Sequence, residues 1–285
     1  MADSKYGNLV QKLNFVKGHG GANAKELVFL GAKDLSGFDF NFIVGVYGEE
    51  GDWAPGAGAH NHPFDELIMF FGYDPTDMNY LGAELDLHMG VEWEKHEVKI
   101  PTVALAPKGF PHIPLITTKV FKDFGHFHLA LSGTYKGKPV EKKGETDGTK
   151  YNHMMKAMIA KEGPGGANAR QIFEMTGEDL GGMNINYVMG LYNEAGEYYP
   201  GKGAQIHPYD EVLVFFGHNT DDMSYLGAEI TVSIGEEKEQ HTFDVPTAIA
   251  IPRGTPHMPI VCNKVDQPYR MMQIGLSPKY ETEWV

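Results

Sequence analysis

Short apolar runs rich in β-branched and aromatic residues recur along the whole chain, and Gly, Pro or Asp separates them. Runs of this length with this punctuation are typical of β-strands. The first half carries FDFNFIVGVY, DELIMFFG, AELDLHMG, HEVKIPTVALAP and HFHLALSG, and the second half carries NINYVMGLY, EVLVFFG, AEITVSIG, HTFDVPTAIAIP and MMQIGLSP. The pattern predicts an all-β barrel or sandwich in each half. The clearest helical candidates lie ahead of each barrel, at 5–16 and 151–161.

The two sets of runs belong to an internal duplication. Gly201 follows Gly56 by 145 positions, and the same offset carries GAGAHNHPFDELIMFFG onto GKGAQIHPYDEVLVFFG without a gap. The match relates about 5–140 to 150–285, much longer than the roughly 20 to 50 residues of a solenoid repeat. We therefore expect two copies of one domain, 1–140 and 150–285, joined by a linker at 141–149 that is rich in Lys and Gly.

A set of candidate metal ligands stands in the first of these two lines. His60, His62 and Glu66 are separated by even numbers of residues, so an extended strand would project all three from one face. Two imidazoles and a carboxylate suit a divalent first-row metal. The turn Pro107–Gly109 precedes His112 at the start of a new strand, so His112 is the candidate for a fourth ligand from a neighbouring strand.

These motifs resemble those of the cupins, and more narrowly of the bicupins, over nearly the whole chain. The first cupin motif fits HNH with Glu66 and Gly72, and the second fits PKGFPH in the first copy and PRGTPH in the second. The resemblance implies two tandem cupin barrels, each a double-stranded β-helix or jelly roll, with short N-terminal helices. It also implies a metal bound by His60, His62, Glu66 and His112, and a homodimer.

The second copy departs from the motif at one position. Gln205 stands where the first copy has His60, while His207, Glu211 and His257 remain. Gln is a poor ligand for such ions, so we expect a second and weaker metal site there. Ordinary structural hydrogen bonding of these histidines remains the alternative, more strongly for the second copy than for the first.

Two further histidines are candidates for catalysis. His126 and His128 share one face of a strand, and their counterparts in the second copy are Met271 and Gln273. Histidine titrates near neutral pH. We therefore expect His128, with His126 as the second candidate, to transfer protons at the first site.

Composition and charge exclude some classes of partner. The formal net charge of −14 disfavours binding to nucleic acid or to an anionic membrane. The polar start MADSKYGN does not resemble a signal peptide, and no apolar run approaches the roughly 20 residues that cross a bilayer. The single Cys262 excludes an internal disulfide framework and a thiolate metal cluster. We expect a soluble, cytoplasmic protein that acts on a small molecule.

The resemblance and the ligand set together predict a metal-dependent enzyme. We expect it to cleave a C–C bond in, or isomerise, a small enolisable carbonyl or phenol-derived compound such as a cyclic or linear β-dicarbonyl, for instance by hydrolytic ring opening. Manganese or iron is the expected metal, and nickel, cobalt and zinc stay open. The alternatives are a ring- or dicarbonyl-cleaving dioxygenase, an oxalate-decarboxylase-like bicupin, which Gln205 disfavours, and a non-catalytic binding or storage cupin.

Overall fold

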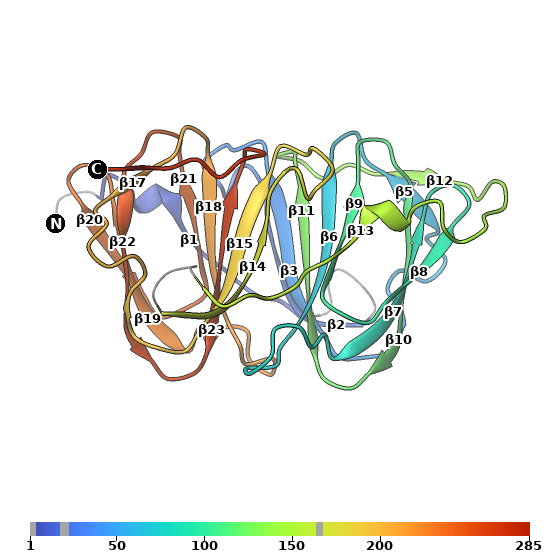
Figure 1. The fold of residues 1–285 in the computed structure, drawn as a ribbon, viewed down its shortest axis with the longest axis horizontal. Coiled ribbons are helices and arrows are strands. Elements are labelled where there is room, and N and C mark those ends of the chain that lie inside the picture. The colour runs from blue at the N-terminus through green and yellow to red at the C-terminus, as the bar shows by residue number, and fades with distance from the viewer. Residues whose placement is uncertain (1–3, 18–22, 164–167) are drawn as a thin grey trace. The chain divides into compact units, whose positions relative to one another are not determined.

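The computed structural model describes residues 4–17, 23–163 and 168–285, and strands dominate it (Figure 1). The chain divides into two compact units. The first barrel consists of Phe15–Lys33 and Gly37–Ile159, and the second barrel of Met1–Asn14, Asp34–Ser36 and Ala160–Val285. In the described part of the chain, no helix is long and apolar enough to cross a bilayer.

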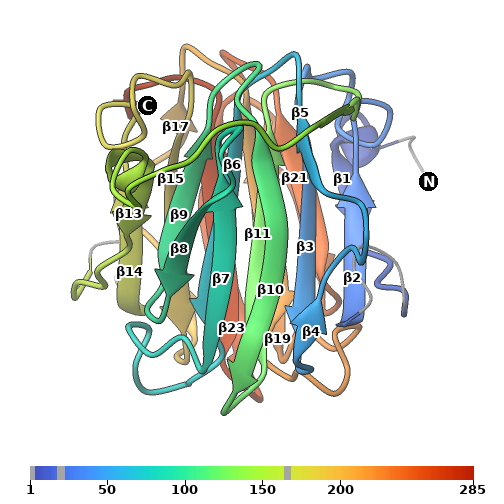
Figure 2. The ribbon, with the colours of Figure 1, turned by 90° about the vertical axis from the view of Figure 1, so that its right-hand side faces the viewer.

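The first barrel is built from two facing sheets, in agreement with the all-β barrel or sandwich that the apolar runs predict. Its elements are β2 (Ala24–Leu30), β3 (Asn41–Tyr47), β4 (Gly51–Asp52), β5 (Ala59–Asn61), β6 (Glu66–Gly72), β7 (Ala83–Met89), β8 (Glu94–Val98), β9 (Thr102–Ala106), β10 (His112–Val120), β11 (Phe124–Ala130), β12 (Lys138–Val140), the 3-10 helix η2 (Asn152–Met154) and β13 (Met155–Ala157). One sheet has the order β13-β9-β6-β11-β3-β2, and the other has the order β12-β5-β10-β7-β8, with β4 also paired to β10. Strands β7 and β10 face the viewer in Figure 2.

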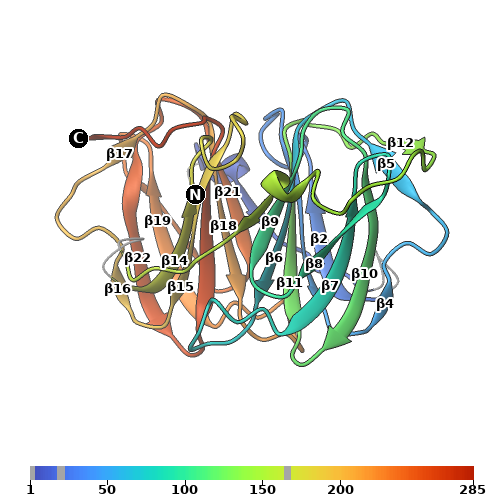
Figure 3. The same ribbon diagram turned by 45° about the vertical axis from the view of Figure 1, so that its right-hand side comes forward.

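The second barrel repeats this arrangement (Figure 3). Its elements are the 3-10 helix η1 (Gly7–Leu9), β1 (Val10–Lys12), β14 (Ala169–Met175), β15 (Asn186–Tyr192), β16 (Gly196–Glu197), β17 (Gln205–Ile206), β18 (Glu211–Gly217), β19 (Ala228–Ile234), β20 (Glu239–Phe243), β21 (Thr247–Ile251), β22 (His257–Val265), β23 (Tyr269–Gly275) and β24 (Glu283–Trp284). The sheet orders are β1-β21-β18-β23-β15-β14 and β20-β19-β22-β17-β24, with β16 also paired to β22.

The units do not follow the boundaries of the sequence repeat. The repeat predicts a break between residues 140 and 150, but the first barrel continues to Ile159, and the second barrel includes residues 1–14. The cause is an exchange of edge strands. Strand β1 pairs antiparallel with β21, and β13 pairs antiparallel with β9, so the first strand of each repeat completes a sheet of the other barrel (Figure 1).

The prediction of helices at 5–16 and 151–161 was wrong, and the exchange of edge strands is the reason. Each segment forms only one 3-10 turn, Gly7–Leu9 or Asn152–Met154, followed by a three-residue strand. An open sheet edge supplies backbone hydrogen-bond partners that a short segment takes in place of its own helical ones. Tertiary pairing and burial therefore override local helix propensity here.

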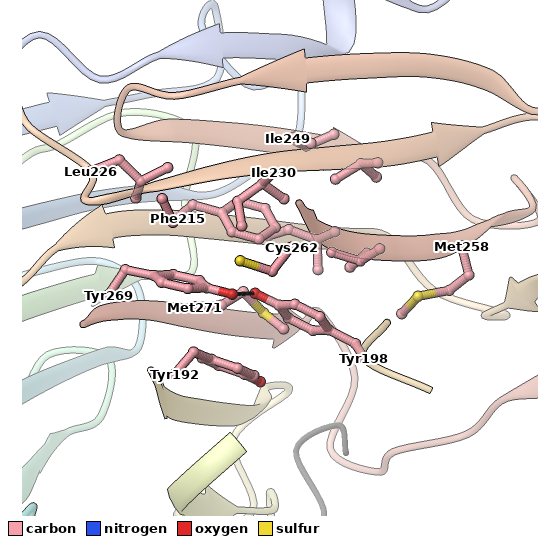
Figure 4. Close-up of a cluster of buried hydrophobic side chains, with 14 of the residues drawn as sticks. Tyr192, Tyr198, Phe215, Leu226, Ile230, Ile249, Met258, Cys262, Tyr269 and Met271 are labelled. Atoms are coloured by element: carbon pink, nitrogen blue, oxygen red, sulfur yellow. Dashed lines mark hydrogen bonds between the residues drawn. The ribbon is translucent and has the colours of Figure 1, made fainter. Parts of the chain in front are cut away.

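Apolar packing in the core of the second barrel holds the N-terminal segment in place. Leu9 is buried among Tyr192, Leu213, Ile230 and other apolar side chains of the unit. Figure 4 shows part of this cluster, in which the hydroxyls of Tyr198 and Tyr269 form a buried hydrogen bond of 2.6 Å. Burying the apolar side chain of Leu9 stabilises the docked segment by roughly 1.5 to 3 kcal/mol.

In the first barrel the incoming segment is held by a buried carboxylate as well as by apolar contacts. Glu94 accepts hydrogen bonds from the backbone N–H of Tyr151 at 2.8 Å and of Lys150 at 3.2 Å, and from the hydroxyl of Thr146 in the predicted linker. The Tyr151 ring packs where a Cβ on Gly90 would clash, and Gly90 also has a φ of +74°. Glycine at this position therefore permits both the turn and the docking of Tyr151.

We expect Glu94→Gln to destabilise the first barrel by about 1.5 to 3 kcal/mol at pH 7, because the backbone donors lose a charged acceptor. Burial alone would raise the pKa of Glu94, but these hydrogen bonds outweigh burial and lower it. The stabilisation is therefore present above the ordinary pKa of 4.5 and is lost as the pH falls through the lowered value. Denaturant melts at pH 7 and pH 3 measure both effects.

The matched control is Glu97→Gln on the same strand, where the carboxylate is exposed and pairs with Lys99. It should leave the free energy of unfolding almost unchanged, because an exposed ion pair contributes little to stability. Equal losses for the two variants would contradict the anchoring role of Glu94.

Candidate metal centre

The predicted ligands of the first site come together inside the first barrel. The imidazole nitrogens of His60, His62 and His112 that could bind a metal all lie within 4.8 Å of one another. Glu66 Oε2 lies 3.1 Å from His62 Nε2 and 3.3 Å from His112 Nε2. His62, Glu66 and His112 are almost completely buried, and His60 is half-buried. The set is three histidines and one carboxylate.

The route by which Glu66 reaches the set differs from the prediction of one continuous strand. His60 lies on β5, but Glu66 is the first residue of β6, which belongs to the other sheet. The chain crosses between the sheets at residues 63–65. The prediction that His112 comes from an adjacent strand is confirmed, because His112 is the direct cross-strand neighbour of His60.

Hydrogen bonds between the two sequence motifs hold this crossing in place. The backbone N–H of Gly109 donates to the His62 carbonyl at 2.7 Å, and that of Lys108 donates to Asp65 Oδ1 at 2.8 Å. The second barrel repeats both bonds, from Gly254 to His207 and from Arg253 to Asp210. The Pro-x-Gly turn therefore fixes the position of the His-x-His segment.

The unpartnered atoms of the first site fit a cation. His62 Nε2, His112 Nε2 and Glu66 Oε2 are buried and have no hydrogen-bond partner. The other ring nitrogens are held from behind, because His62 Nδ1 bonds the Lys136 carbonyl at 2.6 Å and His112 Nδ1 bonds the Phe110 carbonyl at 3.2 Å. Because Nδ1 donates its proton to a carbonyl, Nε2 keeps a free lone pair, and a histidine needs this lone pair to bind a metal.

Burial sets the protonation of the ligands. Desolvation lowers the pKa of His60 to about 4 and that of His112 to about 3, and neighbouring imidazoles contribute. It raises the pKa of Glu66 well above the ordinary value. The histidines are therefore neutral at pH 7 and ready to bind, whereas Glu66 releases its proton when a cation is bound.

A cavity of about 310 Å³ opens onto the ligands. His60, Glu66 and His112 lie at one part of its wall, and Ile43, Trp53, Ile68, Ile113 and Leu115 make much of the rest. None of the residues that line this cavity in the described part of the chain is Lys or Arg. The cavity therefore suits a small and largely apolar molecule.

His126 and His128 both line this cavity, as their shared strand face predicts. His128 Nε2 contacts Glu66 Oε1 directly, and His126 Nδ1 bonds the Met69 carbonyl at 3.1 Å beneath it. Burial lowers the pKa of His126 to about 4 and that of His128 well below the ordinary value. Both are neutral imidazoles at pH 7, so the expected titration near neutrality is not found.

The second set of predicted residues also comes together. The metal-binding atoms of His207, Glu211 and His257 lie within 4.8 Å of one another, and all three residues are buried. Glu211 accepts a 2.7 Å hydrogen bond from Gln273, the counterpart of His128. Burial works to raise the pKa of Glu211, but His257, His207 and Gln273 together leave it lowered.

Gln205 takes part in this second set in its own way. It is fully buried, its Nε2 donates a hydrogen bond to the Tyr280 hydroxyl, and its Oε1 has no hydrogen-bond partner. An amide oxygen is a weaker ligand than imidazole for first-row metals. The second site therefore has two histidines and one carboxylate that come together, with Gln205 beside them as the cross-strand neighbour of His257.

Sequence reasoning missed Tyr135, the tyrosine in the described wall of the first cavity. Its ring lies 4.8 Å from the His62 ring and 5.6 Å from the His128 ring, and the side chain lines the cavity. The available signal was the repeat itself, because Tyr135 corresponds to Tyr280 in an otherwise diverged Gly- and Lys-rich stretch.

We expect metal content to be unequal between the barrels because of the difference between His60 and Gln205. Elemental analysis should show a larger loss of bound metal for His112→Ala than for His257→Ala. The repeat makes the two variants matched controls, since each removes the histidine of its second motif. Equal losses would refute the asymmetry.

Comparisons with known proteins support the architecture. No protein-family model and no curated protein matches the sequence. Among solved structures, one of Bacillus subtilis oxalate decarboxylase concerned with its Mn(II) centres has a TM-score of 0.65 at 10% identity, covering 99% of this chain and 81% of that chain. Another of the same enzyme, on its substrate-binding mode, has a TM-score of 0.64 at 10% identity, covering 99% and 80%. This chain therefore has the bicupin fold, two tandem cupin barrels, that the sequence resemblance implied.

Proposed function

We propose that the first centre is the active site of a metal-dependent enzyme that cleaves a C–C bond in, or isomerises, a small enolisable carbonyl or phenol-derived compound. Cyclic or linear β-dicarbonyls are the favoured substrates, with hydrolytic ring opening as the favoured reaction. One observation carries the proposal. Three unpartnered ligand atoms, on His62, Glu66 and His112, converge beside a cavity with a mostly apolar wall.

The metal would supply the electrostatic part of the chemistry. His60, His62, Glu66 and His112 would hold the cation, which would stabilise negative charge on substrate oxygens and so favour enolisation and cleavage of the adjacent bond. Manganese or iron suits three imidazoles and a carboxylate, and the structural neighbour oxalate decarboxylase has Mn(II) centres. Nickel, cobalt and zinc are the other candidates.

The cavity wall bears on the substrate class. Oxalate is a dianion, and a site built for it would gain from a cationic side chain. The described lining of the first cavity has no Lys or Arg, and Ile43, Ile68 and Leu115 offer apolar contact. These features favour an uncharged or singly charged ring compound over a small dianion.

His128 is our first candidate for proton transfer. It lines the cavity and contacts Glu66 Oε1. A neutral imidazole there accepts a proton from a substrate carbon or from water, and then returns it to the leaving carbon. His126 lies behind it, with a ring-centroid separation of 6.3 Å, and serves as the second candidate.

The proposal is tested by metal analysis joined to a screen of β-dicarbonyl and phenol-derived compounds, with and without oxygen. We expect turnover that needs the metal and proceeds without oxygen. Turnover only with oxygen would identify the dioxygenase alternative. Tight binding without turnover of any compound would favour a non-catalytic binding or storage protein. We also propose that the protein is a homodimer and is located in the cytoplasm.

We expect His128→Gln to leave metal content near normal but to lower turnover by about a hundredfold or more, the usual effect of losing a general acid or base. The second barrel supplies the reason for retained metal, since Gln273 makes the equivalent hydrogen bond to Glu211. Loss of metal in the variant would show that His128 is a ligand. Normal turnover would show that it only lines the cavity.

A further inference from the structure

One tyrosine in each barrel is attached to a metal-site histidine through the neighbouring peptide. Tyr135 precedes Lys136, whose carbonyl accepts the 2.6 Å hydrogen bond from His62 Nδ1. Tyr280 precedes Glu281, whose carbonyl accepts an equal 2.6 Å bond from His207 Nδ1. The peptide that follows each tyrosine is therefore held by the same hydrogen bond in both barrels. A difference between the two tyrosine hydroxyls must then come from the side chains around them.

The two hydroxyls have different surroundings. The Tyr280 hydroxyl accepts a hydrogen bond from Gln205 Nε2. The first barrel has His60 at the position of Gln205, and the Tyr135 hydroxyl has no hydrogen-bond partner in the described part of the chain. The Tyr135 side chain is 47% exposed, and a tyrosine hydroxyl keeps its proton at neutral pH.

The cavities differ accordingly. In the first barrel, the cavity wall includes Tyr135 together with the metal-site residues His60, Glu66 and His112. In the second barrel a cavity of about 380 Å³ is lined by Tyr280 and Gln273, but not by His207, Glu211 or His257. The hydrogen-bonded pair Gln205–Tyr280 lies beside the metal-site residues of the second barrel, because the Tyr280 ring is 5.6 Å from the His207 ring.

We infer that Tyr135 is a substrate-contacting residue of the first centre, where its hydroxyl donates a hydrogen bond to an oxygen of the bound carbonyl compound. This rests on the proposed function of that centre. The hydroxyl remains protonated throughout, and its contribution is to stabilise negative charge that develops on the substrate oxygen. Tyr280 has no such part, because the wall of the cavity that it lines does not include His207, Glu211 or His257.

The test uses the manganese-loaded full chain and cyclohexane-1,3-dione as the probe, with binding measured by titration calorimetry. Tyr135→Phe keeps the ring contacts with His62 and His128 and removes only the hydroxyl. A hydrogen bond to a charged group contributes about 1.5 to 3 kcal/mol, so we expect probe binding to weaken about ten- to a hundredfold, with unchanged manganese content and melting temperature. Tyr280→Phe is the matched control and should bind the probe as the wild type does.

Three results would overturn the inference: equal binding by Tyr135→Phe and wild type, an equal loss in Tyr280→Phe, or no binding of the probe by the wild type. A parallel turnover screen separates it from the proposed function. Selective weakening in Tyr135→Phe without turnover of any compound would uphold the contact and refute the enzymatic proposal. Turnover that Tyr135→Phe leaves unchanged, together with unchanged binding, would refute the contact alone.

Discussion

Three ligand atoms of the first centre, His62 Nε2, His112 Nε2 and Glu66 Oε2, are buried without a hydrogen-bond partner. A buried polar atom in this condition costs about 1 to 3 kcal/mol, and here three of them face one another. The fold can keep these atoms unpartnered because other hydrogen bonds hold the residues that carry them. His62 and His112 are held by carbonyls on Nδ1, and Gly109 is bonded to the His62 carbonyl. A cation would satisfy all three atoms at once.

The same burial determines what else the site can do. Desolvation keeps the histidines neutral and favours protonation of Glu66, while the apolar wall around Ile68 and Leu115 keeps the cavity free of competing charge. A bound oxyanion would therefore be stabilised mainly by the cation and by the few hydrogen-bond donors on the wall. Electrostatic interactions are stronger in such surroundings than in water. A single hydroxyl such as that of Tyr135 then has a measurable influence.

Much of this arrangement could be predicted from the sequence, because the strand runs and the 145-residue repeat constrain the fold strongly. The candidate ligands His60, His62, Glu66 and His112 were predicted from spacing and resemblance, and the structure brings them together. The exchange of β1 and β13 could not be found, since a three-residue strand is specified by the sheet edge that receives it, here β21 or β9, and not by its own pattern. Nor does spacing reveal that the chain crosses sheets between β5 and β6.

The two copies differ at side chains of the metal sites although the supporting bonds are the same. The carbonyl on the His-x-His histidine and the Pro-x-Gly contacts occur in both barrels at nearly equal distances. The side chains that they position have changed, from His60 to Gln205 and from His128 to Gln273. Each change replaces an imidazole with an amide that still makes a hydrogen bond, to Tyr280 in one case and to Glu211 in the other. The second barrel thus has amides at these two positions, and each amide donates a hydrogen bond to its neighbour. Glu211 Oε2, like Glu66 Oε2 in the first barrel, still has no hydrogen-bond partner, so the second set keeps atoms that a cation would satisfy.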